Sequence, residues 1–208
     1  MLRCVCFDLG GVLVKICRTW QHAASVHGIS IALDAEPPIH IWELDEFNRF
    51  QRGEWDEPTY FTRLAARLNV SEEEAERVHN GVLEAPYVGT LELIEDLETQ
   101  GLVTACLSNT NHSHWVEMLE TGRFPNVERL GVKVASHLAR LEKPSPEIYK
   151  AFEEQSGFSG QEICFFDDLE ANVLAAREAG WISHVIDPHG DPAIEMRELL
   201  SCLDAAQR

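Results

Sequence analysis

The first acidic residue of the chain, Asp8, directly follows the apolar run Leu2 to Phe7 and precedes Gly10 and Gly11. If the run is a strand of a parallel sheet, its carboxyl end opens into the crevice where α/β proteins bind ligands. Burying an idle charge there is costly. Taken alone, Asp8 could equally cap the turn after the strand. Its position makes it a candidate catalytic carboxylate.

A second polar motif follows a later apolar run, Leu102 to Leu107. Ser108 and Asn109 begin the polar stretch 108–111, which offers hydroxyl, amide and backbone N–H donors. Such donors suit the oxygens of a bound phosphate group. A polar turn that caps the next helix is the structural alternative. We predict that Ser108 and Asn109 bind substrate.

A third motif contains Lys143, which Pro144 and Pro146 hold on a stiff segment before a helix. A point cation in that place can neutralise a carboxylate and a phosphate together. Lys143 taken alone could also be an ordinary surface lysine. We predict both a catalytic and a substrate-binding role for it.

A pair of carboxylates, Asp167 and Asp168, ends the apolar run Ile163 to Phe166. Paired hard oxygen ligands are what Mg²⁺ takes, usually together with several waters. Without a cation, two neighbouring carboxylates raise the pKa of each other. One aspartate could cap the following helix, but that leaves the other unexplained. The pair therefore predicts a magnesium site.

These motifs lie at the ends of short apolar runs, and the runs alternate with helical patterns. Such alternation is typical of a parallel sheet covered by helices. The expected fold is α/β, a Rossmann-like three-layer core with a parallel sheet and an inserted α-helical cap. The expected strands are 2–7, 102–107, 132–135, 163–166 and 182–186.

Almost a hundred residues separate the first two expected strands, so an insertion must lie between them. Its apolar residues recur with helical spacing, and Ser71 with Glu74 forms a capping box. We expect an α-helical cap over residues 14–86 and an α/β core over 1–13 and 87–208. Six aromatic residues of the insertion are expected in its core rather than in a pocket: Trp42, Phe47, Phe50, Trp55, Tyr60 and Phe61.

The composition of the chain limits which classes of binding partner we expect. The 208-residue chain has a net charge of −18 and no basic run, which disfavours nucleic acid and anionic membranes. No apolar stretch approaches the ~20 residues of a membrane span, and we expect no signal peptide. The six cysteines lack zinc-type spacing, so we expect reduced core residues and a cytoplasmic protein. The expected partner is a small phosphorylated metabolite, and the expected assembly is a monomer or homodimer.

Together the four motifs resemble those of the haloacid dehalogenase (HAD) superfamily, which occur in this order over essentially the whole chain. The resemblance implies a nucleophile at Asp8, a phosphate-binding hydroxyl at Ser108, the motif lysine at Lys143 and metal carboxylates at Asp167 and Asp168. The insertion is similar to the helical cap of subclass I. Three segments look especially like the bacterial glucose-1-phosphate phosphatase branch: Phe7 to Val14, Leu107 to Asn111 and Phe165 to Asn172.

The resemblance has one departure, at Gly10. Most phosphatases of the superfamily carry a second Asp there, which acts as general acid and base and ligates the metal through its carbonyl. The Gly10 carbonyl can still join Asp8 as a Mg²⁺ ligand, but no side chain remains to protonate a leaving group. A positioned acid contributes roughly 10²–10⁴-fold, so most of the rate enhancement could survive. The resembling branch also has Gly at this position.

We therefore expect a Mg²⁺-dependent phosphatase that forms an aspartyl phosphate on Asp8. Its substrates would have good leaving groups, such as anomeric sugar phosphates, or the cap or water would supply the proton. A 2-haloacid dehalogenase and a catalytically silent phosphate-binding protein are the alternatives.

Several cationic and imidazole side chains could add substrate contacts, but the sequence does not decide among them. The spacing of His112 and His114 does not suit a zinc pair. These candidates are Lys15, Arg18, Arg49, Arg52, His112 and His114.

Overall fold

The computed structural model describes residues 1–33 and 37–206. Its main sheet has five strands in the order β5-β4-β1-β6-β7, and every neighbouring pair is parallel. The strands are β1 (Cys4–Phe7), β4 (Val103–Ser108), β5 (Val132–Ala135), β6 (Ile163–Asp167) and β7 (Ile182–Val185). The predicted five-stranded parallel sheet is confirmed.

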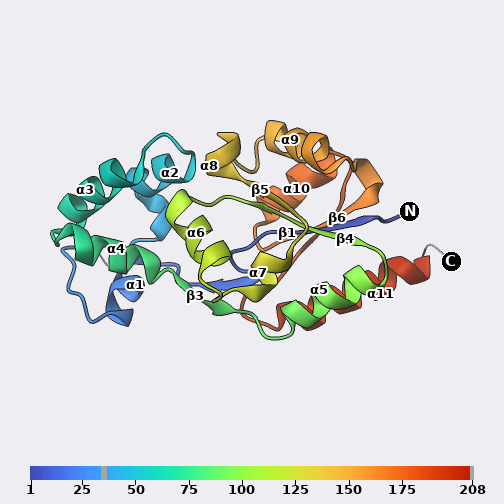
Figure 1. The fold of residues 1–208 in the computed structure, drawn as a ribbon, viewed down its shortest axis with the longest axis horizontal. Helices are drawn as coiled ribbons and strands as arrows, with labels where there is room; N and C mark the ends of the chain where they lie inside the picture. Colours follow the sequence, from blue (N-terminus) through green and yellow to red (C-terminus); the bar gives the residue numbers. More distant parts are fainter. Residues whose placement is uncertain (34–36, 207–208) are drawn as a thin grey trace.

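Helices cover both faces of this sheet (Figure 1). On one face lie α5 (Thr90–Thr99), α6 (His112–Glu120), α7 (Pro125–Arg129) and α11 (Pro192–Ala206); on the other lie α9 (Pro146–Ser156) and α10 (Glu170–Glu178). The alternation of side chains along β1 serves both layers, because Val5 and Phe7 join one core cluster while Cys4 and Cys6 join the other. The three-layer α/β architecture is therefore confirmed.

A second group of helices lies beside the sheet, away from both chain termini (Figure 1). It comprises α1 (Trp20–Val26), the 3₁₀ turn η1 (Ile41–Glu43), α2 (Asp45–Gln51), α3 (Glu57–Leu68) and α4 (Glu72–Asn80). We call it the helical segment. It has its own hydrophobic cluster, in which the rings of Phe50 and Tyr60 stack at 4.2 Å. The predicted capping box of Ser71 and Glu74 is present at the start of α4.

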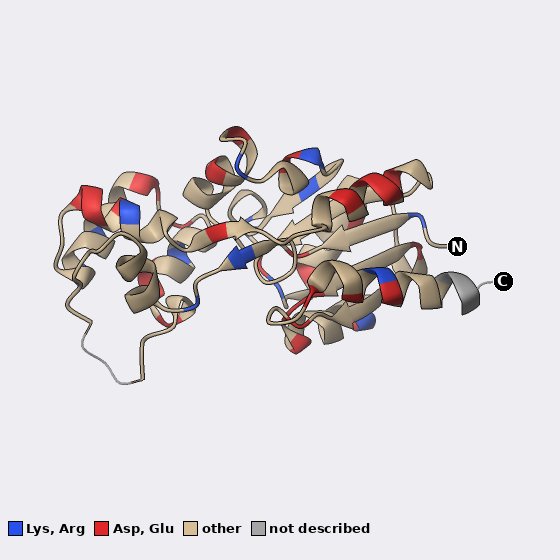
Figure 2. Cartoon of the chain, turned by 90° about the horizontal axis from the view of Figure 1, so that it is seen from below, with Lys and Arg blue, Asp and Glu red and all other residues tan. Residues whose placement is uncertain are grey.

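The ends of the predicted insertion are strands, not helices. β2 (Val14–Ile16) and β3 (Leu83–Pro86) pair antiparallel as a two-stranded ribbon. The chain enters the helical segment through β2 and returns through β3, and Figure 2 shows this narrow connection from below. Runs of three or four residues carry too little periodicity to be recognised as strands from sequence.

Two short elements complete the fold: α8 (Ser136–Ala139) and the 3₁₀ turn η2 (Gly160–Glu162). All six cysteines are free, but Cys202 is exposed on α11, so its predicted place in the core is wrong. Within the described ranges, no helix combines the length and apolar character that a membrane crossing requires.

Candidate active site

Lys143 connects two of the predicted acidic residues at the carboxyl end of the sheet. Its Nζ lies 2.9 Å from Asp8 Oδ1 and 2.6 Å from Asp167 Oδ2. All three side chains are almost completely buried. Burial alone would lower the pKa of Lys143, but Asp167 and Asp8 outweigh it and hold that pKa above its usual value. Lys143 is therefore a fixed positive charge beside Asp8.

Asp167 is held by four hydrogen bonds. Asn172 Nδ2 donates to both of its oxygens at 3.0 Å, the backbone N–H of Leu169 donates to Oδ1 at 2.8 Å, and Lys143 donates to Oδ2. An ionised carboxylate offers about four acceptor positions, so these donors use them up. Asp167 does not line the pocket described below, whereas its neighbour Asp168 does.

Asp168 is paired with a residue from the connection between β2 and α1. Arg18, two residues after β2, donates from Nη2 to Asp168 Oδ2 at 2.5 Å. The same carboxylate explains Gly11: that residue has a φ of +82°, and a Cβ there would lie 2.6 Å from Asp168 Oδ2. A side chain at position 11 would thus collide with this acid as well as strain the backbone.

The three aspartates form one acidic cluster, in which one oxygen of each lies within 4.8 Å of the others. Burial raises the pKa of Asp8 to about 7; Lys143 opposes this increase, and Asp167 and Asp168 add to it. Asp8 Oδ1 is buried and touches Lys143 Nζ without hydrogen-bond geometry. Three carboxylates face two cations, so the donor set fits a further hard cation such as Mg²⁺.

Ser108 and Asn109 follow β4 beside this cluster, as predicted. Ser108 is buried, and both residues line the pocket. The amide of Asn109 also holds the segment of Lys143: its Nδ2 donates to the Lys143 carbonyl at 2.9 Å, and its Oδ1 accepts from the Lys143 N–H at 2.8 Å. One N–H of Asn109 remains for a ligand. Its link to Lys143 was not visible in the sequence.

These groups open into a cavity of about 330 Å³, a size that suits a small organic molecule. The residues at the carboxyl end of the sheet that line the cavity are Asp8, Asp168, Ser108, Asn109 and Lys143, while the helical segment contributes largely apolar side chains. Arg18 lies between the two groups. The wall supplied by η1 and α2 consists of Ile41, Trp42, Phe47 and Gln51.

Two of the six predicted core aromatics thus line the cavity, Trp42 and Phe47. Phe47 is also buried in the helical cluster, but Trp42 is 44% exposed and its predicted burial is wrong. Trp42 lies on the short turn η1 and outside the helical cluster, and its ring stacks on that of His40.

Gly10 also lines the cavity, and its surroundings leave little room for a longer side chain at this position. A Cβ at Gly10 would lie 3.0 Å from Cδ1 of Ile16, a residue of β2. Ile16 therefore fills the space next to the position where the resembling family usually has its general acid.

Of the other cationic candidates, only Arg18 reaches the cavity lining. Lys15 is exposed over the ring of Tyr87, while Arg49 and Arg52 form surface ion pairs with Asp45, Glu54 and Glu142. Among the histidines, His112 is exposed and His114 is buried at the cavity wall. Both belong to α6 rather than to a loop.

His114 connects the sheet domain to the helical segment. Its ring stacks on that of His79 from α4, with 3.9 Å between the centroids, and its Nε2 hydrogen bonds with the His79 carbonyl oxygen at 2.9 Å. Asn111 Oδ1 lies 3.2 Å from His79 Nε2, and the Tyr60 hydroxyl lies 2.8 Å from His79 Nδ1. The buried network had no distinctive sequence signal.

Solved structures with the same fold include a predicted HAD-like family hydrolase from Porphyromonas gingivalis, which is 24% identical with a TM-score of 0.79 and coverage of 96% of this chain and 98% of that one. A HAD family enzyme from Bacteroides thetaiotaomicron, in complex with magnesium and inorganic phosphate, is 23% identical with a TM-score of 0.77 and coverage of 92% and 97%. The L-2-haloacid dehalogenase from Xanthobacter autotrophicus, with chloropropionic acid covalently bound, is 20% identical with a TM-score of 0.65 and coverage of 97% and 83%.

At these identities the structures share the fold, and they include both phosphate-bound and dehalogenase members. The sequence itself matches the haloacid dehalogenase-like hydrolases over residues 2–180. That span contains Asp8, Ser108, Lys143, Asp167 and Asp168, and it confirms the resemblance at the level of the superfamily. The chain belongs to the haloacid dehalogenase-like hydrolase family.

Proposed function

We propose that this protein is a Mg²⁺-dependent phosphatase that transfers the phosphoryl group of a small organic phosphate to Asp8. The observation that carries the proposal is the joint position of Asp8, Asp168 and Lys143 at the wall of one small-molecule cavity. The Bacteroides relative binds magnesium and inorganic phosphate. A phosphate monoester brings the negative charge that such a cation and Lys143 would bind.

Asp8, Asp168 and the Gly10 carbonyl are the groups we assign to the metal. Mg²⁺ held there would supply positive charge to the phosphoryl oxygens and would offset the repulsion within the acidic cluster. Asp167, predicted as another ligand, has its acceptor positions occupied by Lys143, Asn172 and the backbone of Leu169. We assign it the role of holding Lys143 in place.

In the proposed reaction a carboxylate oxygen of Asp8 attacks phosphorus as the bond from phosphorus to the ester oxygen breaks. Lys143 balances the charge of Asp8 and of the phosphoryl group, and Ser108 and the free N–H of Asn109 orient the phosphoryl oxygens. Water then attacks the aspartyl phosphate, which releases inorganic phosphate and restores Asp8.

The leaving oxygen needs a proton that position 10 does not supply. The nearest space is filled by the aliphatic Ile16, so we propose that water in the cavity delivers the proton. Substrates with good leaving groups need this assistance least. An anomeric sugar phosphate, as hydrolysed by the resembling glucose-1-phosphate phosphatases, therefore remains the proposed substrate class.

We propose that the helical segment acts as a cap that selects the organic part of the substrate. Its contribution to the cavity is apolar and aromatic, through Ile41, Trp42 and Phe47. Such a surface suits the C–H face of a sugar ring. Arg18, which lies between this wall and the sheet residues, is the cation that could approach the phosphate if Asp168 held a metal ion.

The test is phosphate release from a panel of anomeric sugar phosphates and simple alkyl phosphates, with Mg²⁺ and with a chelator. Asp8→Asn should abolish turnover, whereas Asp96→Asn, an exposed change on α5, should leave it unchanged. Turnover without metal, or full activity of Asp8→Asn, would overturn the mechanism.

The same panel separates the alternatives. Chloride release from a 2-chloro acid that survives chelation would identify a dehalogenase instead, as the Xanthobacter relative is. Phosphate binding without any turnover would identify a silent binding protein. The buried acidic cluster favours the phosphatase, because neither alternative needs a metal-binding carboxylate at Asp168.

A further inference from the structure

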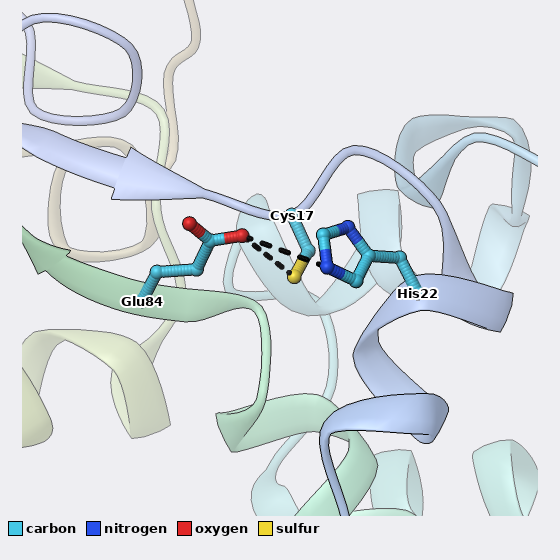
Figure 3. A group of neighbouring side chains, drawn as sticks. All are labelled: Cys17, His22 and Glu84. Carbon is cyan, nitrogen blue, oxygen red and sulfur yellow. Dashed lines mark hydrogen bonds and ion pairs between the residues drawn. The ribbon is translucent and has the colours of Figure 1, made fainter.

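We propose that Cys17, His22 and Glu84 form a second metal site, selective for Zn²⁺ and separate from the acidic cluster. Figure 3 shows the three side chains pointing toward one another from three different elements. Cys17 directly follows β2, His22 lies on α1 and Glu84 lies on β3. Thiolate, imidazole and carboxylate are the ligand types that zinc binds in proteins.

The distances match the size of a zinc coordination sphere. Cys17 Sγ lies 3.2 Å from Glu84 Oε1, His22 Nε2 lies 3.9 Å from the same oxygen, and one ligand atom of each residue lies within 4.8 Å of the others. Ligands at the bond lengths of tetrahedral zinc stand ~3.3–3.7 Å apart. Small rotations of the two exposed side chains, His22 and Glu84, would close this gap without movement of the backbone.

Cys17 supplies the sulfur ligand of the proposed site and is buried. The residue is 1% exposed, and its Sγ donates to Glu84 Oε1 and to the carbonyl of Gly81 at 3.3 Å. Burial raises the pKa of this thiol to about 12, with a smaller contribution from Glu84. Zinc would therefore replace the thiol proton, which leaves to solvent as the S–Zn bond forms.

Charge also favours a divalent ion. The thiolate and Glu84 together carry two negative charges, which Zn²⁺ neutralises, while His22 binds as a neutral imidazole. The exposure of His22 and Glu84 leaves the fourth position open to water. Mg²⁺ prefers oxygen ligands and would not compete for the sulfur.

The site would join both chain connections of the helical segment. Cys17 lies on the entering connection and Glu84 on the returning one, while His22 belongs to the first helix beyond them. Bound zinc would therefore link β2, β3 and α1. Because it binds the folded arrangement, it would also raise the thermal unfolding temperature.

The test is calorimetric titration of the full chain with Zn²⁺ in a large excess of Mg²⁺, paired with Co²⁺ titration to detect thiolate-to-cobalt charge-transfer absorption. We expect one equivalent to bind with release of a proton. Cys17→Ser, His22→Gln and Glu84→Gln should each weaken zinc binding at least ~tenfold, since even loss of an outer partner costs 10–100-fold. The cobalt absorption should disappear in Cys17→Ser.

Matched controls change residues of the same types elsewhere: Cys202→Ser and His189→Gln, both exposed. Asp168→Asn disables the acidic cluster and should keep the cobalt absorption. His22→Gln and Glu84→Gln alter exposed side chains, so they report on binding even if Cys17→Ser fails to fold. Unchanged zinc affinity in these two variants, or loss of the absorption in Asp168→Asn, would overturn the proposal.

Discussion

The guanidinium of Arg18 lies 2.5 Å from the carboxylate of Asp168 and so joins the connection between β2 and α1 to the residue that follows β6. Asp168 is also the proposed metal ligand that lines the cavity. A cation on that carboxylate and a metal ion on it compete for the same negative charge. Arg18 is therefore expected to weaken Mg²⁺ binding when no substrate is present.

Replacing Arg18 with Met should increase the affinity for Mg²⁺. Removal of one partly buried positive charge is expected to strengthen binding up to about tenfold, which corresponds to about 1.4 kcal/mol. Calorimetric titration without substrate measures it. Arg49→Met removes an exposed guanidinium that pairs with Asp45 and should have no effect. Equal affinity in Arg18→Met and the wild type would contradict competition at Asp168.

The stacked histidines predict a loss of stability in mild acid. Burial lowers the pKa of His114 to about 4 and that of His79 well below its usual value, with each further affected by its neighbours. The unfolded chain binds these protons below pH ~6.5 and the folded chain does not, so stability falls as the pH decreases from ~6.5 towards 4. His114 alone would cost about 2 kcal/mol at pH 5.

The measurement is urea unfolding at pH 7.5 and pH 5 in the wild type and in His114→Gln. The raised pKa of Asp8, which burial causes, acts in the opposite sense and stabilises the fold as the pH decreases through 7. It is common to both proteins, so the difference between them isolates the histidine. His189→Gln, an exposed change, should retain the wild-type pH dependence. If His114→Gln lost as much stability between pH 7.5 and pH 5 as the wild type, this assignment would be refuted.

The convergence of Asp8, Ser108, Lys143 and Asp168 could be predicted from sequence because parallel strands bring their carboxyl ends to one edge. A strand period and a polar residue after it are local signals. No knowledge of the packing between helices was needed. The same holds for the capping box of α4, which is encoded within four residues.

Contacts between the sheet and the helical segment could not be predicted in this way. Arg18 meets Asp168 across 150 positions, and His79 meets His114 across 35. Cys17, His22 and Glu84 lack zinc-type spacing because three elements bring them together. The exposure of Cys202 could not be predicted either, because the packing of α11 decides which face of this helix is buried.

Asn172 is expected to stabilise the fold through Asp167. Its amide donates to both oxygens of this fully buried carboxylate, and hydrogen bonds to charged groups contribute more than neutral ones. Asn172→Ala should reduce the free energy of unfolding by about 2–3 kcal/mol and lower the activity by displacing Lys143. Urea denaturation checks it. Asn80→Ala removes only a 3.4 Å contact from Ser113 and should cost less; equal losses would count against a special role for Asn172.

The contact between Gly10 and Ile16 predicts how a general acid could be introduced. A Cβ at position 10 would lie 3.0 Å from Ile16 Cδ1 but 3.7 Å from its Cγ2. Ile16→Val deletes Cδ1 and leaves ordinary contacts. We therefore expect Gly10→Asp alone to be strained, and Gly10→Asp with Ile16→Val to accommodate the new carboxyl.

If protonation of the leaving group limits the reaction, the double variant should hydrolyse alkyl phosphates faster than the wild type, by at most ~10²–10⁴-fold. Anomeric sugar phosphates should gain less, because their leaving groups depend less on an acid. The measurement is kcat/KM for both substrate types, with Ile16→Val alone as the control for cavity size. Equal gains for both types in the double variant would contradict the expected dependence on the leaving group, the absence of any gain would show that protonation does not limit turnover, and equal gains in Ile16→Val would attribute the effect to space rather than to the acid.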